Sequence, residues 1–255
     1  MDKKSDIRTL RHFIAGEWTD AENAKTFEVL NPLDDSLYAH AAKGSAGDMR
    51  KAVAAARAAF ADYRETLPKD RERWLLRVAE IMEARKSDLL DCLIDEIGSP
   101  IQKAMFEFEK GLTMIRAAAG LCRNVRGETI PSDAPGKFSM SIRAPLGVVA
   151  VITPFNVPLI KTTRLVANAL AVGNTVVHLP SEMAPHVDFV TFTGSSIVGQ
   201  RINEICARNK TPNTLELGGK SPTIVLADAD LDKTIPLAAR SIFMFGGQAC
   251  IGSSR

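Results

Sequence analysis

The 255-residue chain carries 32 basic and 30 acidic residues, and this near balance gives no sign of a nucleic-acid or anionic-membrane partner. Its apolar content of 45% and charged content of 24% are typical of a globular protein with a substantial core. We see no apolar run of membrane-spanning length and no secretory signal, and the four cysteines form no disulfide or zinc pattern. These features predict a cytoplasmic protein.

Residues 1–30 are expected to form an N-terminal arm and a hairpin, because Gly16 separates two apolar pieces in the FIAGEW segment at 13–18. Three helices are predicted in the helical region 31–136, the second running unbroken from Pro68 to Gly98. Their apolar stripes are Met49, Val53, Ala56 and Phe60; Trp74, Val78, Ile81, Leu89, Leu93 and Ile97; and Ile101, Met105, Phe108, Leu112, Ile115, Ala119 and Cys122. We expect Cys92, Cys122 and Cys206 to be buried in helices.

The pattern changes at residue 137, where apolar and polar residues alternate through a half-exposed strand at 138–143. Short apolar runs then alternate with helical patterns, which indicates a parallel sheet covered on both faces. The expected strands are 147–153, 175–179, 187–193 and 223–227, and the expected helices are 159–172, 195–208 and 231–245. The fold class is therefore α/β, with a Rossmann-like core over residues 147–228.

One connection in this core is too short. Parallel neighbours need a crossover of roughly a dozen or more residues, usually a helix. Only residues 180–186 separate two of the predicted strands, and they include two prolines. Either these strands are not neighbours, or a helical segment is missing near 180–187.

Two segments combine glycine with polar residues at the ends of strands. Gly194 and Ser195, with Gly199 following, present either N–H groups for a phosphate or an ordinary helix cap. Glu216 stands in an apolar turn before two glycines, where desolvation would raise its pKa and suit a general base. A salt bridge from Glu216 to Lys220 is the alternative.

Two further residues are candidates for chemistry. Asn156, between two prolines after the first core strand, is either a rigid amide donor at the ligand-binding edge of the sheet or the closure of its own turn. Cys250 lies among small residues in the GGQACIGSS segment, which leaves room for a ligand at the thiol. It is a nucleophile in one interpretation and an inert buried thiol in the other.

Five motifs in order resemble the aldehyde dehydrogenase superfamily, whose members use NAD or NADP. The motifs are PFNVP at 154–158, LPSE at 179–182, FTGS at 192–195, LELGGKSP at 215–222 and GQACxxxxR at 247–255. The sequence after PFNVP is most similar to the branch acting on aromatic aldehydes, such as benzaldehyde or vanillin. The resemblance extends from the FIAGEW segment to Arg255, and it implies the fold of the family's cofactor domain with N-terminal helices and an incomplete catalytic domain.

The resemblance implies a catalytic role for three residues. Cys250 would attack the aldehyde carbonyl as a thiolate. The Asn156 side chain and the Cys250 backbone N–H would form an oxyanion hole. Glu216 would activate the water that hydrolyses the thioester to the acid.

The resemblance also implies a cofactor site and no metal site. Gly194, Ser195 and Gly199 would line the dinucleotide phosphates. The other residues expected along the cofactor are Thr153, Pro154, Phe155, Ser181, Glu182, Leu217 and Gly218. An acidic Glu182 near the adenosine ribose would repel a 2′-phosphate, so NAD is favoured over NADP.

Three departures from the family pattern predict little or no turnover. Leu179 replaces the usual lysine, so one ribose hydrogen bond is lost. The short connection near 180–187 replaces a helix, a strand and a second helix of relatives. Residues 229–255 would only begin the catalytic domain, and the oligomerisation-type strand at 137–146 would lack its partner, which compromises the family's homo-oligomer.

Two other classes of function are compatible with the sequence. The chain could be a non-catalytic remnant that binds nucleotide weakly or pairs with a full-length relative. It could also be an unrelated thiol acyltransferase using Cys250. That enzyme would need a histidine partner, and His12, His40, His178 and His186 all lie outside the motifs.

Overall fold

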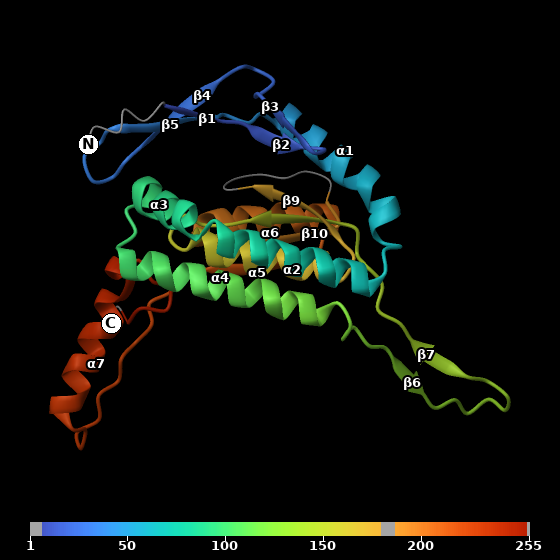
Figure 1. Ribbon diagram of the computed structural model, residues 1–255. Helices are drawn as coiled ribbons and strands as arrows, with labels where there is room; N and C mark the ends of the chain where they lie inside the picture. The colour runs from blue at the N-terminus through green and yellow to red at the C-terminus, as the bar shows by residue number, and fades with distance from the viewer. Residues whose placement is uncertain (1–6, 180–186, 254–255) are drawn as a thin grey trace.

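A four-stranded parallel sheet lies at the centre of the computed structural model, which describes residues 7–179 and 187–253 (Figure 1). Its order is β11-β10-β8-β9. The strands are β8 (Val148–Ile152), β9 (Thr175–Leu179), β10 (Phe189–Gly194) and β11 (Asn213–Leu217). Every residue of β8 is buried, which confirms the predicted parallel sheet with two covered faces.

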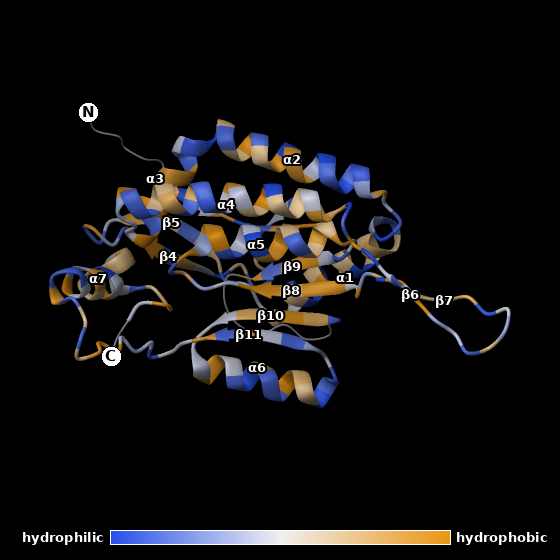
Figure 2. Ribbon diagram, turned by 90° about the horizontal axis from the view of Figure 1, so that it is seen from below, coloured by the Kyte–Doolittle hydropathy of each residue, from blue (hydrophilic) through white to orange (hydrophobic). Residues whose placement is uncertain are grey.

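Helices cover both faces of this sheet (Figure 2). Helix α5 (Pro158–Ala171) connects β8 to β9, and α6 (Ser196–Asn209) connects β10 to β11. Helices α1 (Ala46–Tyr63) and α6 share one core cluster with the inner residues of β8. A second cluster joins α5 to α2 (Pro68–Ala84) and α4 (Ile101–Leu121). The helix after β8 (α5) thus covers one face of the sheet, and the helix after β10 (α6) covers the other.

The position of β8 shows how the two strands joined by residues 180–186 are arranged in the sheet. It lies between β9 and β10, pairing with both in parallel. The two strands are therefore not neighbours in the sheet, and this arrangement leaves the question of a missing segment between them open. The connecting residues 180–186 lie outside the described part of the chain.

The N-terminal hairpin is confirmed as β2 (His12–Ile14) paired antiparallel with β3 (Glu17–Thr19), and Gly16 takes the positive φ of the turn. A second, three-stranded sheet was not predicted. It consists of β1 (Arg8–Leu10), β5 (Leu37–Ala42) and β4 (Thr26–Leu30), in that order. Strands β1 and β4 are largely exposed, whereas β5 is partly buried along its whole length.

The predicted strand at 138–143 is shorter and more exposed than expected. It is β7 (Ser139–Ser141), paired with β6 (Glu128–Ile130), and this hairpin projects from the body of the protein (Figure 1). All residues of both strands are exposed, and Phe138 and Ile142 beside them are about three-quarters exposed, at 76% and 74%. The prediction of a half-buried strand is therefore wrong for this chain taken alone.

The helix predicted from Pro68 to Gly98 is in fact two helices, α2 and α3 (Lys86–Ile97). Arg85 between them leaves the helical conformation, at φ −106° and ψ 26°. The predicted inner face of α2 is also wrong, because Trp74, Val78 and Ile81 are exposed. The buried face is formed by Arg71, Leu75, Ala79 and Met82. Cys122 and Cys206 are buried as predicted, whereas Cys92 is only partly buried.

The C-terminal region departs most from the prediction. Residues 223–227 form no strand, although they lie within the described part, and Ile224 is 80% exposed. The fourth strand of the sheet is instead β11. Helix α7 (Leu231–Phe243) buries none of its side chains and is followed by the short 3₁₀ helix η1 (Met244–Gly247). Across the described residues, no helix has both the length and the apolar character to cross a membrane.

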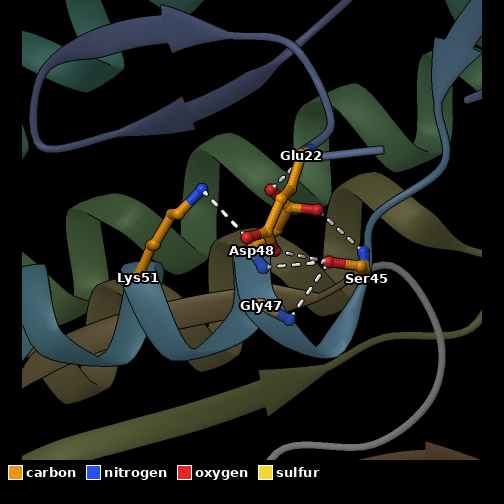
Figure 3. A network of polar contacts seen from close by, with 5 residues as sticks. All are labelled: Glu22, Ser45, Gly47, Asp48 and Lys51. Carbon is orange, nitrogen blue, oxygen red and sulfur yellow. Dashed lines mark hydrogen bonds and ion pairs between the residues drawn. The ribbon is translucent and has the colours of Figure 1, made fainter. Parts of the chain in front are cut away.

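A capping box fixes the start of α1 (Figure 3). The Ser45 hydroxyl accepts hydrogen bonds from the N–H groups of Gly47 and Asp48, at 3.0 and 3.2 Å. The buried Asp48 carboxylate accepts from the N–H groups of Ser45 and Glu22, at 2.8 and 3.0 Å. Burial by itself would raise the pKa of Asp48, but these hydrogen bonds outweigh it and lower the pKa below its ordinary value.

Replacing Asp48 by asparagine is expected to lower the free energy of unfolding by about 1–2 kcal/mol at neutral pH, because an amide offers one acceptor oxygen where two are used. The folded pKa is depressed, so the stabilisation is complete above the unfolded pKa of about 3.9 and is lost as the pH falls through the folded value. Urea unfolding at neutral and acidic pH measures this, with Asp62→Asn on the exposed surface of α1 as the control. A wild-type advantage that does not shrink in acid would contradict it.

Candidate active site

The predicted cofactor residues that the structure describes lie at one edge of the parallel sheet. Gly194 ends β10 and pairs with Leu217, which ends β11. Thr153 directly follows β8, whose last residue Ile152 pairs with Phe192 of β10. Pro154 and Phe155 continue from Thr153, and Gly218 continues from Leu217. This edge, between strands whose helices leave to opposite faces, is where open α/β sheets bind ligands.

The start of α6 lies at this edge. Ser195 is its N-cap, and its hydroxyl accepts from the Val198 N–H at 3.4 Å. Within the described residues, the N–H groups of Ser196 and Ile197 have no acceptor, which suits an anionic group such as a phosphate. The cap and the phosphate interpretations are thus compatible.

Gly199 permits close packing at the same place. It is buried in α6, and a Cβ atom there would lie 2.3 Å from Leu217 Cδ2. The absence of a side chain therefore lets α6 lie against the end of β11. This contact sets how near the helix N-terminus comes to the sheet edge.

A histidine that was not assigned to the site contacts Thr153. The His178 ring Nε2 lies 2.9 Å from Thr153 Oγ1 and 3.3 Å from Thr162 Oγ1. The residue is exposed over part of its surface, yet burial of the ring lowers the pKa of His178 below its ordinary value. Burial of the ring thus favours the neutral imidazole. His178 lies in none of the motifs, so no sequence signal assigned it to the site.

One cavity of about 560 Å³ brings together residues that are far apart in the sequence. Asn156 and Cys250 both line it. The other lining residues are Gly218, Gly219, Lys220, Ile242, Phe243, Gly246, Gly247, Gln248, Ala249, Gly252 and Ser253. The Asn156 Nδ2 donates a hydrogen bond to the backbone carbonyl of Gln248 at 2.8 Å. This bond ties the loop after β8 to the segment that carries Cys250.

The cysteine segment has an unusual backbone. Phe245, Gly246 and Gly247 have positive φ values of 55°, 69° and 76°, so two glycines occupy positions that disfavour other residues. The ring of Phe245 packs against Phe106 of α4, with centroids 5.2 Å apart. Cys250 follows this bend and is exposed, which excludes the interpretation of a buried thiol.

Glu216 differs from its prediction. It lies in β11 rather than in a turn, opposite Thr193, and its side chain is exposed. The desolvation on which its predicted basicity depended is therefore absent. It does not line the cavity, and the described residues give it no ion pair with Lys220. Lys220 itself lines the cavity, as do the two glycines before it.

Ser181, Glu182 and Arg255 lie outside the described residues. The predictions for them, including the preference for NAD based on Glu182, remain predictions.

Comparison with known proteins identifies the family. The sequence matches the Aldehyde dehydrogenase family over two segments, residues 18–187 and 183–255. The chain belongs to the aldehyde dehydrogenase family. The two matched segments meet at 183–187, where the sequence pattern predicted a missing segment.

Individual aldehyde dehydrogenases support this identification. Vanillin dehydrogenase from Pseudomonas fluorescens is 35% identical over 283 residues. Salicylaldehyde dehydrogenase from Pseudomonas putida G7, solved with salicylaldehyde, is 30% identical with a TM-score of 0.91 and is matched over 96% of this chain. Betaine aldehyde dehydrogenase from Staphylococcus aureus, solved with NAD+, is 27% identical with the same TM-score over 96% of this chain.

The match covers only part of each relative. This chain spans 58% of the vanillin dehydrogenase, 59% of the salicylaldehyde dehydrogenase and 56% of the betaine aldehyde dehydrogenase. The alignment to vanillin dehydrogenase takes in 95% of the chain, yet its 283 positions exceed the 255 residues of the chain, so it contains positions with no residue here. The chain therefore spans little more than half the length of the relatives that it matches.

Proposed function

We propose that this chain carries the cofactor core and the nucleophile segment of an NAD(P)-dependent aldehyde dehydrogenase, with an aromatic aldehyde as substrate. The observation that carries the proposal is the shared cavity of Asn156 and Cys250, contributed by segments far apart in the sequence. The names of the vanillin and salicylaldehyde dehydrogenases among its relatives support the aromatic substrate. Residues 147–228 would form the cofactor core, and residues 229–255 would begin the catalytic domain.

The chemistry follows from the groups in the cavity. The Cys250 thiolate adds to the aldehyde carbon, forming a C–S bond and an oxyanion. An amide nitrogen carries two hydrogens, so Asn156 can donate one to Gln248 and the other to this oxyanion. A bound nicotinamide cofactor would supply the hydride acceptor that turns the adduct into a thioester. Water activated by Glu216 would then release the acid and the thiol, which requires Glu216 to approach the cavity from β11.

The sheet edge fits such a cofactor. Among the described residues, the N–H groups of Ser196 and Ile197 lack an acceptor and suit the phosphates, and Thr153, Phe155 and Leu217 would lie along the dinucleotide. NAD is favoured if Glu182 lies near the ribose, and NADP otherwise.

We expect Cys250 to be the thiol that salicylaldehyde protects. The chain is treated with iodoacetamide with and without the aldehyde, and alkylation of each cysteine is followed by mass spectrometry. Slower alkylation of Cys250, with no change at the partly buried Cys92, is the expected result. Asn156→Ala should weaken this protection because the oxyanion loses a donor. Equal alkylation of Cys250 with and without aldehyde would contradict the proposal.

We also propose that the chain turns over little. Cys250 and Glu216 are both exposed, and neither is enclosed against water. NADH absorbance in the presence of NAD+ and salicylaldehyde should stay near the level of Cys250→Ala. Vigorous NADH formation that disappears in Cys250→Ala would refute the inactivity while supporting the nucleophile.

A second function is favoured by the exposed apolar side chains of the C-terminal region, among them Ile224, Leu237 and Phe243. A non-catalytic chain that pairs with a full-length relative would bury them. Gel filtration of a mixture with such a relative tests this, with the relative alone as the control. Separate elution of the two chains would contradict it.

A further inference from the structure

A buried polar network lies at the first turns of α4, and none of its side chains lines the cavity. Lys103 and Glu107 are 5% and 0% exposed, and Ser99 before the helix is 3% exposed. The Lys103 ammonium donates to Ser99 Oγ and to Glu107 Oε1, both at 2.7 Å. Charged side chains are rarely buried this completely unless they are paired. The pair occupies a place that apolar residues could fill.

The second carboxylate oxygen of Glu107 reaches another helix. Glu107 Oε2 accepts from the Leu159 N–H at 3.3 Å, in the first turn of α5. Helix α5 begins at Pro158 after Val157, and neither residue has a side chain that can cap the helix. Glu107 therefore supplies from α4 the acceptor and the negative charge that the start of α5 lacks.

The start of α5 is continuous with the loop that carries Asn156. Only Val157 and Pro158 separate Asn156 from Leu159. Gly111, one turn after Glu107, brings α4 close to α5: a Cβ atom there would lie 3.4 Å from Leu159 Cγ and 3.3 Å from Thr163 Oγ1. A displacement of Leu159 would therefore move Asn156 relative to Gln248, its hydrogen-bond partner in the cavity.

We propose that Glu107, held by Lys103, is a positioning residue that fixes the Asn156 amide at the cavity. This role explains why α4 contains a buried Lys103–Glu107 pair although none of its side chains lines the cavity. The catalytic meaning of the role rests on the proposed function. The positioning itself can be observed without catalysis.

The test is the side-chain amide signal of Asn156 in a ¹⁵N-correlated NMR spectrum of the full chain, assigned by its loss in Asn156→Ala. Glu107→Gln should shift this signal and speed exchange of the Leu159 amide about tenfold, because the glutamine cannot accept from both Lys103 and Leu159. The control is Glu109→Gln on the same helix, whose carboxylate pairs with Lys86 at the surface. It should leave the signal in place.

Two further variants separate positioning from general destabilisation. Leu112→Ala removes a buried side chain of α4 and should lower stability without shifting the Asn156 signal. Ser99→Ala, a milder change, should shift the signal in the same direction as Glu107→Gln even if the latter fails to fold. An unmoved Asn156 signal in Ser99→Ala and in a folded Glu107→Gln, or an equal shift in Leu112→Ala, would overturn the proposal. Neither outcome depends on the aldehyde chemistry of Cys250.

Discussion

Replacing Gly147 by alanine is expected to lower the free energy of unfolding by about 3 kcal/mol. Gly147 has φ +135°, and a Cβ atom there would lie 2.1 Å from Asp188 Oδ2. That oxygen accepts from the Val148 N–H at 2.7 Å and pairs with Arg57 of α1 at 2.6 Å. The alanine would therefore add backbone strain and also displace the carboxylate from both partners.

Gly136→Ala is the matched control, because Gly136 also has a positive φ, of +76°, but has no heavy atom near its would-be Cβ. It should lower stability by about 1 kcal/mol, from backbone strain alone. Urea unfolding of both variants measures the difference. If the two losses are equal, the contact with Asp188 contributes nothing and the prediction is wrong.

Asp188 affects the site because it lies directly before β10 and bonds to Val148, the first residue of β8. Its N–H donates to the Val148 carbonyl at 2.9 Å, so β8 and β10 are held in register from their amino ends. The same register places Thr153 and Gly194 together at the carboxyl edge. Gly147→Ala is therefore expected to displace the residues of the proposed cofactor site as well as to lower stability.

The sequence predicted the sheet well where burial on both sides leaves a simple pattern. The uninterrupted apolar run of β8 and the helices that follow β8 and β10 needed no tertiary information. Because parallel strands end at one edge, the strand pattern also brings Thr153 and Gly194 together, but it missed β11 and therefore did not place Leu217.

The predicted strand at 223–227 and the predicted inner face of α2 were wrong because they depend on tertiary packing. Residues 223–227 have the β-branched, apolar composition of a strand, but in the described part of the chain they pair with no strand, and β11 is the edge of the sheet. In α2 the stripe of Trp74, Val78 and Ile81 competes with that of Leu75, Ala79 and Met82, and α4 covers the second. Arg71 is buried on this second face, where it donates to the Ala171 carbonyl at 3.1 Å. Because arginine is usually exposed, its presence made this face difficult to recognise from the sequence.

The sequence also predicted only part of the candidate site. The motifs alone left two interpretations each for Asn156 and Cys250. The structure shows that the two residues line one cavity. Glu216 is exposed, so its environment could not be read from the apolar residues beside it. Lys103 and Glu107 are spaced as an ordinary surface ion pair of a helix, and nothing in that spacing distinguishes a buried pair from an exposed one.

Replacing Lys103 by methionine is expected to lower the free energy of unfolding by about 3–5 kcal/mol, since it leaves the fully buried Glu107 without its cation. The control is Lys86→Met, because Lys86 forms an ion pair with Glu109 at 2.9 Å on the exposed surface. That change should lower stability by less than about 1 kcal/mol. Urea unfolding of both variants gives the comparison, and similar losses would show that the Lys103–Glu107 pair is not desolvated.

The double variant Lys103→Met with Glu107→Met separates stability from positioning. Removing both charges should recover about 2 kcal/mol or more relative to Lys103→Met, because no buried ion is left unpaired. Leu159 would still lose the acceptor for its N–H, so the Asn156 signal should remain displaced although the fold is restored. Additive losses from the two substitutions would contradict the first expectation, and an Asn156 signal at its wild-type position would contradict the second. If both expectations hold, part of the loss in Lys103→Met comes from the unpaired Glu107 carboxylate, and the charge pair orders the loop of Asn156 separately from its effect on stability.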